Sequence, residues 1–169
     1  MHIPFTSLPE MLEVAGAVLF GLAAMQDIAL RLVPNAVPLA IGGVGATLRA
    51  LDSNLPTGLV VSAVVFLVAA MCWRRGWLGG ADVKLFGAGA LLVPPAAAFG
   101  FVLSSCLAGG ILAIGYWLIG RITAPPTTKR PSNLLRRLVR VERRRLRRGG
   151  PLPYAVAITA GACFMLIKV

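Results

Sequence analysis

The sequence has few of the residues that soluble enzymes most often use for catalysis. Its single histidine, His2, lies at the extreme N-terminus, which nearly excludes a Ser-His-Asp or Cys-His centre and any zinc site built on HExxH. The three cysteines are Cys72, Cys106 and Cys163. Their wide spacing supports no metal tetrad, and their odd number argues against a purely intramolecular set of disulfides. The sequence therefore predicts neither a metal site nor a cofactor.

Acidic residues are also scarce. Six residues are Asp or Glu, against 17 Lys and Arg, which gives a net charge of +11. Eleven of the 17 basic residues lie between Arg121 and Arg148. This concentration in one stretch is typical of a cytoplasmic loop of a membrane protein, so we expect no nucleic-acid partner.

Apolar residues make up most of the chain. Hydrophobic residues account for 57% of the sequence and charged residues for 14%, and the mean hydropathy is +0.81. Several apolar stretches approach the roughly 20 residues that cross a bilayer as a helix, and helices satisfy their own backbone groups in lipid. The sequence predicts an all-α integral membrane protein with one domain, residues 1–169.

Six apolar segments are expected to form transmembrane helices. They run from about Met11 to Leu30, Ala36 to Leu51, Thr57 to Trp73, Val83 to Val93, Ala96 to Gly120, and from Pro151 to the C-terminus. The fourth segment is long enough for only about half to two thirds of a crossing, at about 1.5 Å per residue. Residues 121–150 form a basic loop inserted before the last helix.

The positions of the basic residues predict the orientation. With six spans, the loops after segments one, three and five share a side, and they carry Arg31, Arg74, Arg75, Lys84 and the basic loop. The opposite loops offer Asp52, with Arg49 the one contrary charge. The positive-inside rule places the basic loops in the cytoplasm and both termini outside it.

The basic loop allows two interpretations. Leu134, Leu138 and Leu146 fall near helical spacing among the arginines, which favours a helix lying on an anionic lipid leaflet. The loop could instead bind an acidic partner. We favour the lipid surface.

The polar stretch Gly79-Gly80-Ala81-Asp82-Val83-Lys84 interrupts the apolar sequence. We expect the two glycines to give the backbone access to positive φ and to let a substrate approach closely. An acid beside a membrane segment is costly and usually faces a cavity or a partner. Asp27, near the end of the first segment, is the only other carboxylate so placed. The predicted topology puts both on the cytoplasmic face, so we predict a pair.

Two adjacent carboxylates share a proton and titrate together. One can activate water as a base while the other, protonated, polarises a carbonyl, which cleaves an amide without histidine or metal. The dipole of its own helix favours Asp82 as the anion. We therefore expect Asp82 to be the base and Asp27 the proton carrier, although a coupled pair can exchange these roles.

Each of these residues also has a plainer interpretation. Asp82 could be the N-cap of a helix, and Asp27 could form an ion pair with Arg31 one turn later. Lys84 could anchor a helix end at the lipid headgroups instead of acting at the site. Asp52, on the far side, reads as a simple loop residue.

Three motifs together resemble those of type IV prepilin peptidases. Asp27 with Val33-Pro34-Asn35 resembles the D-x-R-x-x-x-I-P-N segment of that family, residues 79–85 resemble its GxGD-V-K-L motif, and Leu152-Pro153-Tyr154 opens a stretch similar to the L/I-P-Y-G-x-A-I start of its last helix. Three positions depart from the motifs: Ala29 for arginine, Ala81 for glycine and Ala155 for glycine. No family role is carried onto Arg31, because Ala29 stands where the motif has its arginine.

The resemblance implies an aspartic membrane endopeptidase with catalytic Asp27 and Asp82, which removes the short basic leader of pilin-like precursors at the cytoplasmic face of a bacterial or archaeal cytoplasmic membrane. It implies that Gly79, Gly80, Ala81 and Lys84 belong to a loop at the active site. It gives Pro34, Asn35, Pro153 and Tyr154 a structural role. The chain begins at the first helix and lacks paired C-x-x-C motifs, so it resembles the short Flp or tight-adherence form, and we expect no methyltransferase activity. Presenilin-like GxGD proteases are a more distant relation.

Two other classes of function stay open on the sequence alone. Intramembrane acids could relay protons in a small transporter or channel, and a non-enzymatic subunit of a pilus or secretion assembly could bind lipid through the basic loop. Both leave the match at residues 79–84 unexplained.

Overall fold

The computed structural model describes residues 7–122 and 152–168, which form helices and no strand. The six α-helices in these ranges are α1 (Leu8–Leu30), α2 (Ala36–Leu51), α3 (Leu55–Arg74), α4 (Gly80–Leu92), α5 (Ala98–Ile122) and α7 (Tyr154–Lys168). A 3₁₀ turn, η1 (Pro95–Ala97), precedes α5. The predicted all-α class is confirmed. Most of the predicted basic loop lies outside the described residues.

The first two helices end where the sequence predicts, but α1 ends for a different reason than the one expected. α1 ends at Leu30 as expected, but its C-cap is Arg31 in the left-handed conformation, with φ of 54° and its N–H bonded to the Asp27 carbonyl. The left-handed residue that ends α1 therefore comes before Pro34 in the chain, and the end of the helix does not depend on that proline. α2 begins at Ala36, directly after Asn35, and ends at Leu51, as predicted.

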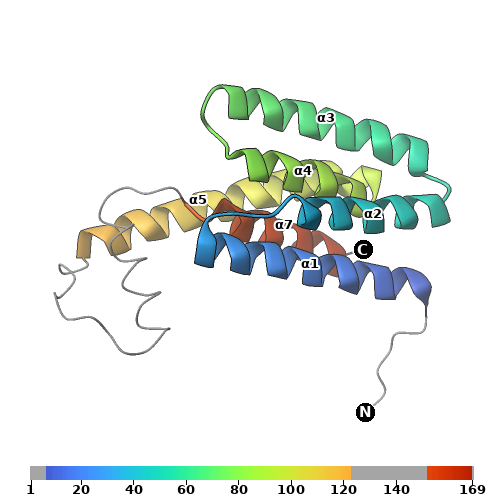
Figure 1. The fold of residues 1–169 in the computed structure, drawn as a ribbon, viewed down its shortest axis with the longest axis horizontal. Helices are drawn as coiled ribbons and strands as arrows, with labels where there is room; N and C mark the ends of the chain where they lie inside the picture. Colours follow the sequence, from blue (N-terminus) through green and yellow to red (C-terminus); the bar gives the residue numbers. More distant parts are fainter. Residues whose placement is uncertain (1–6, 123–151, 169) are drawn as a thin grey trace, which may run out of the picture.

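Successive helices run in opposite directions (Figure 1). The end of α1, the α3–α4 connection and the end of α5 consequently lie at the left of Figure 1, whereas α1 begins and α7 ends at the right. We call the left-hand end, which carries Arg74, Arg75 and Arg121, the basic end. Asp27, near the end of α1, and Asp82, at the start of α4, both lie toward it.

α4 is the central helix of the bundle. It packs against α2, α3, α5 and α7, and eight of its 13 residues are buried. Glycines permit this close packing: a Cβ on Gly45 of α2 would lie 2.7 Å from the backbone nitrogen of Leu92, and one on Gly89 would lie 2.5 Å from the Phe101 ring. At about 1.5 Å per residue α4 is roughly 20 Å long, short of the bilayer's hydrocarbon thickness of about 30 Å.

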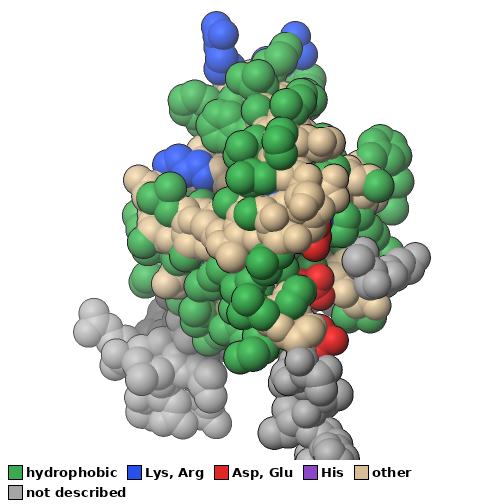
Figure 2. All heavy atoms as spheres, turned by 90° about the vertical axis from the view of Figure 1, so that its right-hand side faces the viewer, with side chains coloured by type: hydrophobic (Ala, Val, Ile, Leu, Met, Phe, Trp, Pro, Cys, Tyr) green, Lys and Arg blue, Asp and Glu red, His purple; other side chains and the backbone are tan. Residues whose placement is uncertain are grey.

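The outer helices expose apolar surface of a kind that a bilayer covers. Three helical stretches are long and apolar enough to span a membrane, namely Leu8–Leu30, Leu55–Arg74 and Pro95–Ile119. Of these, α3 buries only Gly58 and Ala69. Figure 2 shows the end opposite the basic end, where apolar side chains dominate and a few acidic ones gather. The described residues thus support a membrane protein, while six complete crossings stay a prediction.

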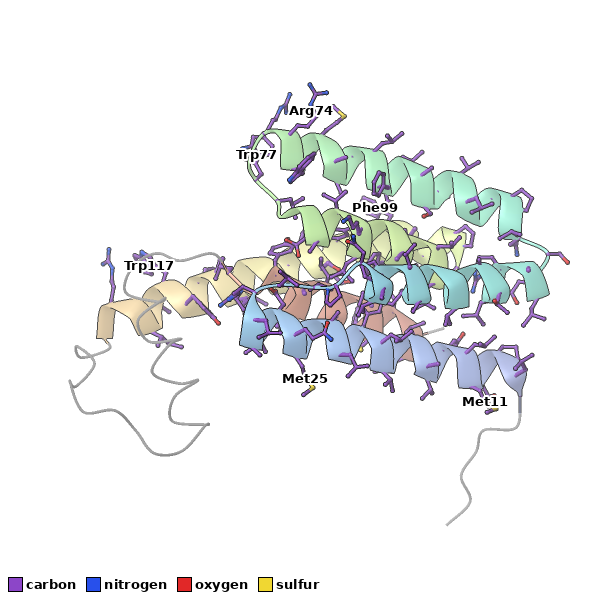
Figure 3. The ribbon with its side chains drawn as sticks, in the orientation of Figure 1. Met11, Met25, Arg74, Trp77, Phe99 and Trp117 are labelled. Atoms are coloured by element: carbon purple, nitrogen blue, oxygen red, sulfur yellow. The ribbon has the colours of Figure 1, made fainter. Side chains whose placement is uncertain are left out.

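Tryptophan and arginine side chains pair at the basic end. The Arg75 guanidinium lies 5.5 Å from the Trp77 ring and that of Arg121 lies 4.1 Å from the Trp117 ring. Figure 3 shows Trp77 and Trp117 at this same end of α3 and α5. Such pairs are favourable cation–π contacts, and tryptophan is enriched where a membrane meets water.

Candidate active site

Asp27 meets the first turn of the last helix. It lies in the last turn of α1 and is half-buried, and its Oδ2 accepts the backbone N–H of Ala155 at 3.1 Å. The first N–H groups of a helix have no partner within it, and the helix dipole places partial positive charge there. The start of α7 therefore stabilises a negative charge on Asp27.

Asp82 lies in the first turn of α4. Its Oδ2 accepts the backbone N–H of Gly79 at 3.2 Å, as the third residue of a helix does in a capping box. The N-cap is Gly79, so Asp82 caps the helix from its third position and is not the N-cap residue itself. The carboxylate nevertheless satisfies a donor at the helix start.

The two aspartates act on each other electrostatically. Asp82 is half-buried ahead of the apolar part of α4, and its pKa is raised to about 6, chiefly by burial and then by the negative charge of Asp27. The hydrogen bond from Gly79 opposes this shift without cancelling it. The structure thus brings together two acids that are 55 positions apart in the sequence, one from α1 and one from α4.

Tyr154 forms a third side of the site. It begins α7 directly after Pro153, which is fully buried. Its ring centroid lies 6.3 Å from that of Phe86, and its hydroxyl is close enough to Asp82 to sense the charge of that carboxylate. Gly109 of α5 makes room for the ring, since a Cβ there would lie 2.5 Å from it. The motif residues Pro153 and Tyr154 therefore place the Ala155 N–H and an aromatic wall.

The conformations of the motif glycines differ from the prediction. Gly79 has φ of −77° and ψ of 149°, and Gly80 is the first residue of α4. The left-handed glycine is Gly76, at φ of 77° in the preceding turn. The expectation of positive φ at residues 79 and 80 is wrong, because the chain reverses before the motif. What Gly79 supplies is space: a Cβ there would lie 2.8 Å from Asp82 Oδ2.

The other motif residues occupy the surroundings of the pair. Lys84 Nζ donates to Asn35 Oδ1 at 2.7 Å, which joins the first motif to the second and ties the start of α2 to α4. Pro34 is exposed in the connection before Asn35. Ala81 is half-buried against the core. Lys84 thus lies in the first half of α4 and reaches the N-cap of α2.

The opposite end of α2 holds an ion pair that the sequence interpretation missed. Arg49 is 3% exposed, and its NH1 lies 2.9 Å from Asp52 Oδ2. Asp52 lies in the turn after α2, as predicted, and the ion pair is a contact that this prediction did not include. The spacing of three residues, from the last turn of α2 to its C-cap, could have indicated the pair. Asp52 neutralises the charge of Arg49. The position of Arg49 on the predicted non-cytoplasmic side therefore conflicts less with the orientation that the positive-inside rule gives.

Sequence reasoning also missed the Ala155 donor, which is a backbone group and has no signature in the sequence. Within residues 7–122 and 152–168, no group of three or more His, Cys, Asp or Glu side chains is arranged to hold a metal ion. The candidate site within these residues contains two interacting carboxyl groups.

Comparison with known proteins gives one match. A family model described as "Type IV leader peptidase family" matches residues 14–114, more than half of the chain. The matched range contains Asp27, Asn35 and residues 79–84. Neither the curated proteins nor the solved structures contain a significant match.

Proposed function

The chain belongs to the type IV leader peptidase family, and from that premise we propose that it is an aspartic membrane endopeptidase. Its substrates are type IV prepilins of the Flp-like kind, from which it removes the short basic leader at the cytoplasmic membrane face. The observation that carries this proposal is the meeting of Asp27, Asp82 and the start of α7. The Trp and Arg pairs at the same end support a site at the level of the lipid headgroups.

The contacts of the two aspartates support distinct roles. Asp27 accepts an N–H at the positive end of α7, which favours its anion. The pKa of Asp82 is raised to about 6 by burial and by the charge of Asp27, which favours its protonated form. These contacts favour Asp27 as the base and Asp82 as the acid, the reverse of the assignment expected from the sequence, although a coupled pair can exchange these roles.

The proposed reaction follows from these roles. Asp27 takes a proton from water as the oxygen attacks the scissile carbonyl carbon, and Asp82 gives its proton to the carbonyl oxygen. The resulting tetrahedral gem-diol then collapses. Asp27 passes its proton to the leaving nitrogen as the C–N bond breaks, and Asp82 recovers a proton from a gem-diol hydroxyl. Both carboxyl groups return to their starting state, and one water is consumed.

The proposal is tested by co-expressing the protein with a pilin-like precursor and following the mobility shift that leader removal causes. Asp27→Asn and Asp82→Asn should each abolish the shift, because an amide has the shape of the acid but cannot carry its proton. Glu10→Gln is the matched control, since Glu10 is exposed at the start of α1, far along the helix from Asp27. Cleavage near the wild-type rate by either aspartate variant would overturn the proposal.

A further inference from the structure

An uncharged groove opens along α3 and α5. Its volume is about 540 Å³, and we call it the α3/α5 groove. Phe86 of α4 and Tyr154 of α7 contribute to its lining, and its walls include Val60, Val64, Val68 and Cys72 of α3 and Phe99 and Cys106 of α5. None of the described residues that line it is charged.

This groove borders the candidate active site through Phe86 and Tyr154. Phe86 lies one helical turn after Asp82, so the two side chains share a face of α4. Tyr154 lines the groove and senses the charge of Asp82. A second groove, of about 680 Å³ between α2 and α3, is lined instead by Lys84 and Ala88. It lies on another face of α4, and we call it the α2/α3 groove.

We propose that the α3/α5 groove receives the apolar helix of the precursor, entering sideways from the lipid. This inference rests on the proposed function and deepens it. The valines at positions 60, 64 and 68 recur every four residues and form a ridge of the kind that packs against another helix. From Val60 to Cys72 the ridge extends about 18 Å, which matches roughly three turns of a docked helix. Phe99, labelled in Figure 3, is 78% exposed, so the groove is open at its side.

A substrate helix fits this groove better than a phospholipid does. The lining holds no cation for a headgroup phosphate, whereas the α2/α3 groove has Lys84. The proximity of the groove to Asp82 would also not stabilise a bound lipid chain, because such a chain is apolar. A helix in the α3/α5 groove, by contrast, places the residues that precede it beside the two carboxyl groups, where the leader must be cut.

Native cysteines allow a direct test of binding. Cys106 is exposed and lines the groove, whereas Cys163 of α7 is half-buried and lies outside its lining. The full-length Asp82→Asn protein is combined in membranes with precursors that each carry one cysteine in the apolar helix, and the mixture is oxidised. Disulfides form only when the Cα atoms approach to roughly 4.4–6.8 Å. We expect links to Cys106 from precursor positions spaced three or four residues apart, and their loss in Cys106→Ser. Bound precursor that forms no link to Cys106 or to Cys72, which also lines the groove, or that links equally to Cys163, would overturn the inference.

A matched pair of substitutions tests the consequence for cleavage. Val64 lines the α3/α5 groove and is 54% exposed, and Leu67 lines the α2/α3 groove and is 61% exposed. Val64→Trp should lower kcat/KM for the full precursor at least tenfold while leaving unchanged the cleavage of a short peptide that spans only the leader junction. Leu67→Trp should leave both unchanged. Normal precursor cleavage by Val64→Trp, or an equal loss in Leu67→Trp, would contradict the proposed groove.

The two experiments separate this inference from the proposed function. Disulfide formation does not require cleavage, so it tests binding of the precursor in the groove even if the wild-type protein cleaves no precursor. Wild-type cleavage without links to Cys106 or Cys72 would refute the groove and leave the peptidase proposal intact. Absence of cleavage of both substrates by wild-type protein would refute the peptidase proposal.

Discussion

Replacing Gly79 by alanine should move the Asp82 carboxylate without unfolding the protein. An added Cβ would lie 2.8 Å from Asp82 Oδ2, about 0.6 Å closer than the 3.4 Å at which ordinary contacts begin. The backbone at Gly79, with φ of −77° and ψ of 149°, is allowed for alanine. The strain is therefore relieved by the flexible carboxylate, which must also adjust its 3.2 Å bond from the Gly79 N–H. Because a misplacement of about 1 Å at a reacting group can cost roughly 100-fold in rate, we expect kcat to fall about ten- to 100-fold.

Gly80→Ala is the matched control for this prediction. A Cβ at Gly80 would lie 3.5 Å from the nearest side-chain atom of Trp73, an ordinary contact. Both variants should reach the membrane in wild-type amounts and unfold at nearly the wild-type temperature in detergent. Precursor cleavage by purified protein should fall in Gly79→Ala only. If Gly79→Ala cleaves within twofold of the wild-type rate, space beside Asp82 is not what the glycine provides.

Three further predictions follow from the same contacts. Because Asp82 must be protonated to act as the acid and its pKa is raised to about 6, kcat should fall about tenfold per pH unit above that value; a rate that stays level from pH 6 to 8 would contradict the assignment. Asn35→Ala removes the acceptor of the Lys84 bond and should lower the free energy of unfolding by about 0.5–1.5 kcal/mol, measured by thermal unfolding in detergent, with an unchanged melting temperature as the contrary result. Asp52→Asn removes the carboxylate that is paired with the buried Arg49 and should destabilise the protein by about 1–3 kcal/mol, a loss limited by the partial exposure of Asp52; stability equal to wild type would show that the ion pair contributes nothing.

The sequence predicted the helices well because their limits are local. Asn35 and Asp52 flank α2 at both ends, and a proline lies in the first turn of α3. The location of Asp27 and Asp82 at the same end of the bundle was also predictable, because it follows from the number of apolar segments between them. The positions of polar and turn residues in the chain carry this information directly.

The contacts on which the proposed roles within the pair rest could not be predicted in the same way. Asp82 lies at the start of its own helix, and this is visible in the sequence. Asp27 receives its N–H from Ala155, a residue 128 positions away, and any residue except proline could supply such a donor. Burial of Asp82 depends on the packing of several helices around α4, which no local pattern encodes. The left-handed turn at Gly76 could not be predicted, because a glycine adopts either sign of φ about equally well and the sequence does not show which one the turn requires.

The central claim is that Asp27 and Asp82 act as one catalytic unit. The most direct measurement is the single-turnover cleavage rate of a full-length precursor by purified wild-type protein, Asp27→Asn, Asp82→Asn and the double variant. Residues that act together give strongly non-additive losses. We predict that each single variant loses at least about 1,000-fold and that the double variant loses no more than the worse single one. A single variant that retains a rate within tenfold of wild type, or losses that simply multiply in the double variant, would contradict the account.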